Sequence, residues 1–174
     1  MTAGAQPGGV RIGELNAGHR ERLEAIVRGT GSFREPEVEV ALEVFDSGLG
    51  LRGAEPDGDY QFVGAFAGSG ELLGYAAFGP TPVTEGTWDL YWIAVAKEAH
   101  GKGVGSALLA AVEAKLASSR GRMLLIETSS RTDYEATRGF YAARGYAEQA
   151  RIRDFYAVDD DRVMLTKTFT TERR

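Results

Sequence analysis

The amino-acid sequence predicts a mixed α+β domain built on a β-sheet. Residues 87–95, "TWDLYWIAV", alternate in the manner of a strand, whereas residues from about 103 to 117 repeat their apolar positions at helical spacing. Two short apolar and aromatic runs flank Gly-Ser-Gly at 68–70, which indicates a β-hairpin. The length of 174 residues, with 43% hydrophobic and 26% charged residues, fits one globular domain with a sizeable core.

The first part of the chain is expected to contain a tail, a strand and two helices. Residues 1–8, rich in Gly and Ala, are expected to be a disordered tail ahead of a single domain over residues 9–174. Residues 10–15, "VRIGEL", are the expected first strand, and Asn16 is the expected N-cap of the first helix. The second helix is expected to start at Pro36, the favoured first helical position. The residues that share the apolar face of each helix are Leu23, Ile26 and Val27 in the first and Val38, Leu42 and Phe45 in the second.

The remainder of the chain predicts a sheet with one crossover. After the hairpin around residues 68–70, the strand at 87–95 leads through a helix to a buried strand, "RMLLIETS", at 122–129. The segment "TDYEATRGFYAARG" predicts a short helix that ends at Gly145. Two further strands are expected between residues 146 and 169, joined by the acidic run "VDDD" as a solvated turn. The predicted order is therefore two helices, an antiparallel meander, one strand–helix–strand crossover and a closing hairpin.

Composition excludes several classes of function. The chain has no cysteine, which excludes disulfides, thiolate metal sites and thiol nucleophiles, and with only two histidines a catalytic zinc site is not expected. The net charge of −5 argues against a nucleic-acid partner. No apolar run approaches the roughly 20 residues that cross a bilayer, and the first ten residues do not read as a signal peptide. We therefore expect a cytoplasmic protein with no membrane partner and no metal; a homodimer is compatible with the sequence.

Three glycines alternate in "HGKGVG", where the strand pattern gives way to the helix pattern. A helix N-terminus offers unpaired N–H groups and a partial positive charge, and glycines beside it let a bulky anion approach the backbone. Gly101, Gly103 and Gly105 therefore predict an anion site, to which Lys102 adds a charge. The alternative is a loop that merely turns a corner. The order of residues fits neither the Walker phosphate loop nor the dinucleotide fingerprint, because this sequence lacks a residue that each motif requires.

The pattern resembles the pyrophosphate-binding loop of the GNAT acyltransferase superfamily, Gln/Arg-x-x-Gly-x-Gly/Ala. The preceding "LYWIAV" resembles the fourth strand of that family, and "GFYAARGY" resembles its late-helix signature. The resemblance implies a twisted, mostly antiparallel sheet flanked by helices, with the crossover at an acetyl-CoA site. The strand would pair with the pantetheine arm, and the loop amides would surround the pyrophosphate. The residues that the resemblance assigns to the cofactor are Ile93, Ala94, Val95, His100, Gly101, Lys102, Gly103, Val104, Gly105, Ser106, Tyr134 and Tyr141.

The sequence departs from the family pattern at two of these positions. His100 stands where the family has Gln or Arg, which changes one side-chain contact but leaves the backbone loop intact. Tyr134 stands where the family often has an Asn that contacts pantetheine, so that amide contact is absent here.

Three residues are candidates for the chemistry. Asp89 stands where some family members place a glutamate base, four residues before Ile93, although it could equally orient a neighbour or face water. Glu127 ends the apolar run "MLLIE" and is either a second base or a strand-end carboxylate that binds substrate or loop backbone. Tyr141 matches the tyrosine that protonates the leaving thiolate in many family members, the alternative being an ordinary helix aromatic.

We therefore expect an N-acetyltransferase that moves acetyl from acetyl-CoA directly to the amine of a small molecule, without an acyl-enzyme. The alternatives are a protein or peptide N-acetyltransferase and a non-catalytic CoA-binding regulatory module. The preference for a small molecule comes from acidic residues in the first two predicted helices and their loop that would suit a cation, namely Glu35, Glu37, Glu39, Glu43 and Asp46.

Overall fold

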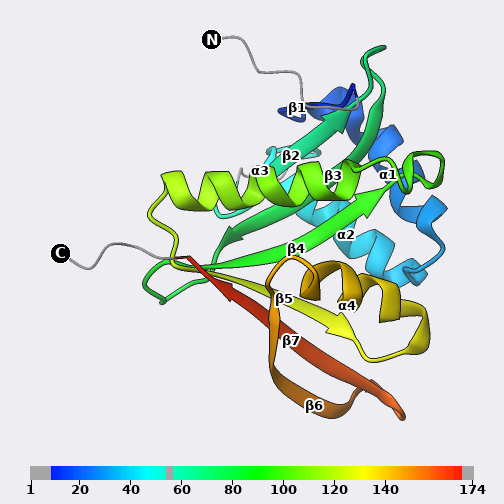
Figure 1. The fold of residues 1–174 in the computed structure, drawn as a ribbon. Coiled ribbons are helices and arrows are strands. Elements are labelled where there is room, and N and C mark those ends of the chain that lie inside the picture. Colours follow the sequence, from blue (N-terminus) through cyan, green and yellow to red (C-terminus); the bar gives the residue numbers. More distant parts are fainter. Residues whose placement is uncertain (1–8, 54–56, 170–174) are drawn as a thin grey trace. The chain divides into compact units, whose positions relative to one another are not determined.

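A computed structural model describes residues 9–53 and 57–169. The expected tail at residues 1–8 lies outside the described residues. Seven strands form one sheet in the order β1-β2-β3-β4-β5-β7-β6 (Figure 1). The β4–β5 pair is parallel, and the pairs β1–β2, β2–β3, β5–β7 and β6–β7 are antiparallel. The predicted α+β class with a mostly antiparallel sheet and one crossover is confirmed.

The chain divides into two compact units, which are described in turn. One comprises residues up to 79 together with residues 92–115, and the other comprises residues 80–91 together with those from 116 onward. The expectation of a single domain over residues 9–174 stays a prediction. No helix within the described ranges is long and apolar enough to cross a membrane.

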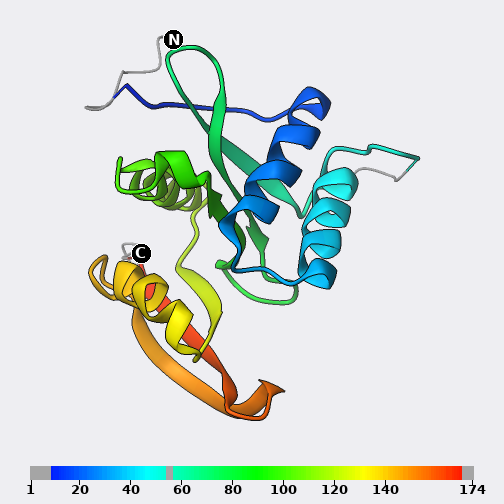
Figure 2. The ribbon, with the colours of Figure 1, turned by 90° about the vertical axis from the view of Figure 1, so that its right-hand side faces the viewer.

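The first unit holds the first three strands, two helices, the end of β4 and most of α3. Its elements are β1 Arg11–Gly13, the 3-10 turn η1 Ala17–His19, α1 Arg20–Thr30, α2 Glu35–Gly48, β2 Gln61–Phe66, β3 Leu72–Pro80, the end of β4 Thr87–Val95, the 3-10 turn η2 Lys97–Ala99, and the start of α3 Val104–Ser118. The helices α1 and α2 lie side by side (Figure 2). Every residue predicted for their apolar faces is buried.

The first helix starts later than the sequence indicated. The Asn16 side chain accepts a hydrogen bond from the Gly18 amide at 2.9 Å and caps η1, and α1 itself begins at Arg20. The predicted hairpin turn is present, since the Ala67 amide donates to the Glu71 carbonyl at 2.9 Å.

Close packing fixes the path of β4 in the first unit. A Cβ placed on Gly74 of β3 would lie 2.8 Å from the Ala94 carbonyl oxygen and 3.2 Å from a methyl group of Leu108. Because nothing larger than glycine fits there, the backbone of β4 and helix α3 both approach β3 closely. Leu108 is fully buried, as are the α3 residues Val104 and Val112, and these anchor the helix whose N-terminus forms the site described below.

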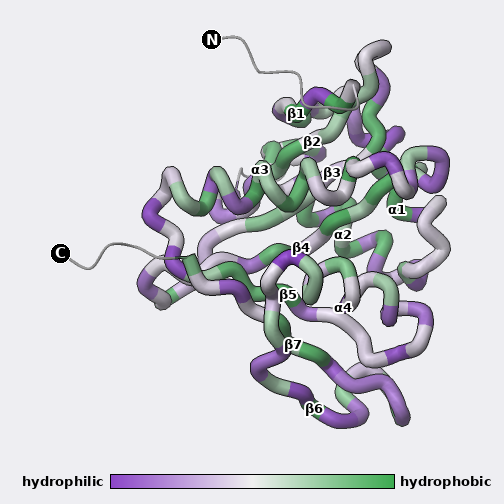
Figure 3. The backbone as a smooth tube through the Cα atoms, viewed as in Figure 1, coloured by the Kyte–Doolittle hydropathy of each residue, from purple (hydrophilic) through white to green (hydrophobic). Residues whose placement is uncertain are grey.

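The second unit holds the start of β4, the end of α3 and the C-terminal elements. These elements are β5 Met123–Ser129, the 3-10 turn η3 Thr132–Tyr134, α4 Glu135–Ala142, β6 Ala147–Ala157 and β7 Asp160–Thr168. The parallel register of β4 with β5 runs from Thr87↔Met123 to Leu90↔Ile126. Figure 3 shows mostly hydrophilic residues along β6, whose residues are almost all exposed.

The acidic run after β6 is not a solvated turn throughout. Asp160 is the first residue of β7 and is only 6% exposed. Its carboxylate accepts a hydrogen bond from the Ser129 hydroxyl at 2.5 Å, and a guanidinium nitrogen of Arg131 lies 4.0 Å away. The prediction was wrong for this residue because a hydroxyl and a cation from elsewhere in the unit compensate the buried charge.

Candidate active site

The loop between β4 and α3 has an open, left-handed backbone at two glycines. After η2 the chain passes through His100 and enters α3 at Val104. The φ angles of Gly101 and Gly103 are 71° and 80°, and a Cβ at either position would meet nothing within 4 Å. The glycines are therefore required for the course of the backbone, and the space beside them is open.

The amides of this loop are available to a ligand. In the part of the chain that the structure describes, residues 100–103 form a turn, but no well-aligned hydrogen bond joins the amides of Gly101 to Gly105 to a backbone carbonyl; the first such bond in the helix runs from the Ala107 amide to the Gly103 carbonyl at 3.0 Å. A row of N–H groups without a well-aligned backbone partner, at the positive end of a helix, suits a diphosphate. The residues present therefore fit the pyrophosphate of CoA.

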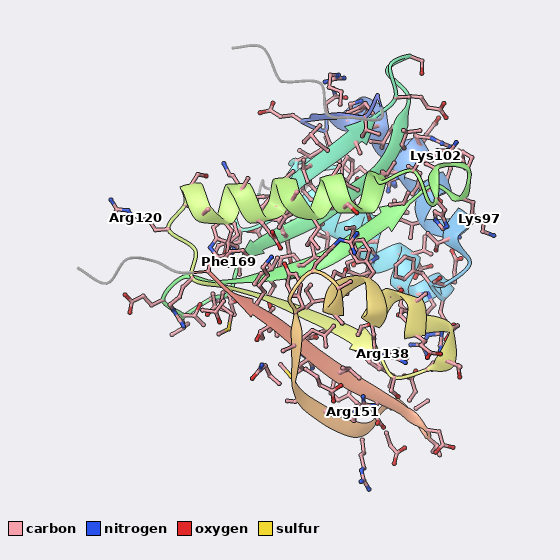
Figure 4. All side chains as sticks on the ribbon, in the orientation of Figure 1. Lys97, Lys102, Arg120, Arg138, Arg151 and Phe169 are labelled. Atoms are coloured by element: carbon pink, nitrogen blue, oxygen red, sulfur yellow. The ribbon has the colours of Figure 1, made fainter. Side chains whose placement is uncertain are left out.

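Two lysines lie in this part of the sequence, one before the loop and one within it. Lys97 and Lys102 lie in η2 and in the loop itself, and both are labelled in Figure 4. Lys102 is exposed and adds a positive charge beside the amides of the loop.

The end of β4 leads directly into this loop. Ala94 is buried, whereas Ile93 and Val95 are partly exposed. His100 folds back on the strand, and its Nε2 lies 2.9 Å from the Val95 carbonyl oxygen. A carbonyl can only accept, so the ring donates this bond from Nε2. The predicted cofactor residue His100 thus contacts the backbone beside the loop in this structure.

Asp89, in the second unit, is held by a threonine. The Thr81 hydroxyl donates to the Asp89 carboxylate at 2.7 Å, and the Thr81 amide donates to the Thr87 carbonyl at 2.8 Å. Asp89 is partly exposed and has no ion pair among the described residues. Its second carboxylate oxygen can therefore accept a proton or a hydrogen bond.

Glu127 has a different environment on β5. It is exposed and forms an ion pair with Arg162 of β7, whose guanidinium also lies 4.8 Å from the centre of the Phe155 ring. The Arg162 guanidinium occupies the Glu127 carboxylate and places a positive charge beside it. This arrangement corresponds more closely to the structural role considered for Glu127.

Tyr141 lies on α4 and is only 2% exposed. Its ring makes edge contacts with the rings of Phe140 and Tyr146, at centroid distances of 5.2 and 5.7 Å. Burial raises the pKa of the Tyr141 phenol above its usual range. The hydroxyl therefore stays protonated at neutral pH. Tyr134 precedes α4, and the Arg131 guanidinium lies 5.2 Å from the centre of its ring.

The predicted residues fall into two groups. The structure brings residues 93–106 together around the start of α3 in the first unit, and Asp89, Glu127, Tyr134 and Tyr141 lie in the second unit. Within the described part of the chain, no cluster of three or more His, Asp or Glu side chains could hold a metal ion.

Sequence reasoning missed the polar partners of these groups. No sequence motif marks these partners. Thr81 binds Asp89, Arg162 binds Glu127, and Arg22 binds Glu98. A signal for them would have required knowledge of which strands and turns are neighbours.

Comparison with known proteins gives a consistent result. A model of the acetyltransferase (GNAT) family matches residues 26–146. A crystal structure described as an acetyltransferase of the GNAT family from Desulfovibrio desulfuricans is 38% identical, has a TM-score of 0.84, and is matched over 91% of this chain and 98% of that one. No curated protein sequence matches the chain significantly.

More distant solved structures share the fold. An aminoglycoside 6'-N-acetyltransferase complexed with coenzyme A is 18% identical with a TM-score of 0.71, over 94% of this chain and 99% of that one. The ribosomal-protein-S18-alanine N-acetyltransferase from Escherichia coli is 18% identical with a TM-score of 0.74, over 95% of this chain and 98% of that one. The family match and the 38% identical structure both cover most of the chain, and they agree with the glycine loop at the start of α3. The chain therefore belongs to the acetyltransferase (GNAT) family.

Proposed function

We propose that the protein is an acetyl-CoA-dependent N-acetyltransferase that transfers the acetyl group directly to the amine of a small molecule. The observation that carries this proposal is the row of available amides from Gly101 to Gly105 at the N-terminus of α3. These amides, with Ser106 and the charge of Lys102, would bind the pyrophosphate. The backbone of residues 93–95 would pair with the pantetheine arm.

Acetyl-CoA supplies, when bound, the thioester carbonyl that an amine attacks while the C–S bond breaks. The obstacle is the protonation of the amine. A lysine-like amine with a pKa near 10.4 is neutral in about one molecule in 2,500 at pH 7, a cost of roughly 4.6 kcal/mol, whereas an α-amine near pKa 8 costs about 1.4 kcal/mol. A base is therefore most valuable for a strongly basic acceptor.

We assign the base to Asp89 in preference to Glu127. Asp89 has one carboxylate oxygen bound by the Thr81 hydroxyl, which orients the group, and it has no cationic partner in the described ranges. It would take the proton of the ammonium, directly or through a water molecule. Glu127 is neutralised by Arg162 and would support the sheet.

We assign the acid to Tyr141. A tyrosine phenol is protonated at neutral pH, so Tyr141 can donate its proton to the departing thiolate of coenzyme A. The side chain is held by aromatic contacts on two sides, which limits its rotation. Tyr134 remains a proposed contact of the cofactor.

The acidic residues of α2 give limited support to a small cationic acceptor. Glu39, Glu43 and Asp46 line a surface pocket of about 460 Å³, but Arg20 and Arg52 line it as well. Asp46 is paired with Arg20, however, and Glu35 and Glu37 are also paired with arginines. A cytoplasmic location and a homodimer stay predictions from the sequence.

Release of free CoA tests the proposal. Because the chain has no cysteine, a thiol reagent added to the reaction detects CoA without background from the protein. Small amines, an α-amine peptide and a lysine peptide should be compared, and small amines are expected to give the highest kcat/KM. Tyr141→Phe should lower kcat by about 100-fold and leave the Kd of acetyl-CoA nearly unchanged.

Two outcomes would overturn the proposal in different ways. Turnover on peptides alone would identify a peptide or protein acetyltransferase. Saturable binding of acetyl-CoA without turnover on any amine would identify a CoA-binding module.

A further inference from the structure

One arginine of α1 joins three segments that are far apart in the sequence. The Nε of Arg22 donates to the Leu72 carbonyl at the start of β3 at 3.1 Å. Its Nη2 lies 2.6 Å from a carboxylate oxygen of Glu98 in η2 and 3.0 Å from one of Glu71 in the hairpin turn. All four residues belong to the first unit.

The turn that Arg22 holds is the corner at which β4 becomes the anion-binding loop. We call residues 96–100 the corner. The Ala96 amide donates to the Leu73 carbonyl at 2.8 Å, and the Ala99 amide donates to the Ala96 carbonyl at 2.9 Å. Arg22 therefore links Glu98, in the middle of the corner, to strand β3. The Leu73 carbonyl of that strand already accepts a hydrogen bond from the amide of Ala96, the first residue of the corner.

Arg22 also neutralises a charge that opposes the ligand. The hydrogen bond from Arg22 is the main cause that lowers the pKa of the Glu98 carboxyl below its usual range, and Lys102 contributes to the same shift. Glu98 is therefore an anion close in sequence to a loop that must bind a diphosphate. Without Arg22 this carboxylate would lose its strongest cationic partner, and its charge would oppose an anionic ligand at the loop.

From these contacts we infer that Arg22 is a positioning residue for the anion-binding loop, acting through Glu98. The inference rests on the proposed function of that loop. The planar guanidinium uses two of its nitrogens on three acceptors, so a shorter or single-donor side chain cannot replace it. Because the Arg22 side chain is 32% exposed and that of Glu98 is 61% exposed, the effect on folding stability is small, and the effect on the order of the loop is the quantity to measure.

Arg28 provides a matched control. It lies on the same helix, is 42% exposed, and pairs with two carboxylates, those of Glu24 and Glu35, neither of which belongs to the corner. Arg22→Ala and Arg28→Ala remove the same side chain and a similar number of surface ion pairs. Only Arg22→Ala should affect the loop.

The first measurement is the Kd of acetyl-CoA by calorimetry. Arg22→Ala should weaken binding about fivefold, and Arg28→Ala should change it by less than about 1.5-fold. Adding Glu98→Gln to Arg22→Ala removes the unpaired charge and should restore at least half of the lost binding on a logarithmic scale. Equal losses in the two single variants, or no recovery in the double variant, would overturn the role of Glu98.

The second measurement does not require the ligand. Amide hydrogen exchange of the protein alone should be about fivefold faster at Ala99 and His100 in Arg22→Ala and unchanged in Arg28→Ala, because both amides bond within the corner. Unchanged exchange in Arg22→Ala would refute the inference. If the unmodified protein binds no acetyl-CoA, the proposed function fails, and the exchange experiment still decides whether Arg22 holds the corner.

Discussion

Replacing Gly103 with alanine tests the loop most sharply. The φ of Gly103 is 80°, and a Cβ there would meet nothing within 4 Å. The cost of Gly103→Ala is therefore backbone strain, with no steric clash inside the protein. A left-handed conformation costs an alanine about 1 kcal/mol, which the loop can relieve by rotating out of this region.

The expected loss of acetyl-CoA affinity in Gly103→Ala follows from the number of loop amides that would turn away from the ligand with the backbone. A hydrogen bond to a charged group contributes about 1.5–3 kcal/mol, so the loss of one amide–phosphate bond weakens binding by about tenfold to a hundredfold. If the loop does not relax, the new methyl group occupies the open space in which the ligand would lie. Both routes predict a higher Kd for acetyl-CoA.

Gly70→Ala is the control for strain alone. Gly70 lies in the hairpin turn of the same unit, has a φ of 91°, and likewise has no atom within 4 Å of an added Cβ. Both variants should lose about 1 kcal/mol of stability, a fall in Tm of roughly 2–4 °C. Calorimetry should show weaker acetyl-CoA binding only for Gly103→Ala. An unchanged Kd in Gly103→Ala, or the same loss in Gly70→Ala, would refute the reasoning.

Three further predictions concern buried or charged side chains. The hydroxyl of Tyr75 is buried and has no hydrogen-bond partner in the part of the chain that the structure describes. Tyr75→Phe should therefore leave the free energy of unfolding in urea unchanged or raise it by about 1 kcal/mol, and a loss above about 1 kcal/mol would reveal a partner. Burial raises the pKa of Tyr141, so the contribution of its protonated phenol to the free energy of unfolding is complete below the ordinary tyrosine pKa of about 10 and decreases as the pH rises above that value. Free energies of unfolding measured from pH 9 to 11 should therefore decline less in Tyr141→Phe than in the unmodified protein, and equal slopes would contradict this. Asp89→Asn should lower kcat by about 100-fold, whereas Glu127→Gln should change it by less than about threefold; the reverse order in steady-state assays would move the base to Glu127.

Local patterns in the sequence were sufficient for most of the fold. The alternation in "TWDLYWIAV" predicted β4 with the bounds that the structure has, Thr87–Val95. The helix face predicted from Leu23, Ile26 and Val27 is buried in α1. The start of α1 was misjudged because a 3-10 turn and a helix share the same N-cap chemistry at Asn16, and a local pattern cannot distinguish them.

The candidate site was only partly accessible from the sequence. The glycines before α3 identified the loop because their spacing is itself the chemical signal, and the structure has left-handed backbone at Gly101 and Gly103. The ionic partners were not accessible, since Arg22 and Glu98 are 76 positions apart and Glu127 and Arg162 are 35 apart. Such contacts depend on which strands and turns are neighbours, and that is a property of the folded chain.

Titration of ¹⁵N-labelled protein with acetyl-CoA, followed by amide NMR, tests the central claim most directly. The account predicts large, saturable shifts at the amides of Gly101 to Gly105, since these groups would donate to the pyrophosphate. Saturable binding that leaves those resonances in place, or no binding at millimolar acetyl-CoA, would contradict it.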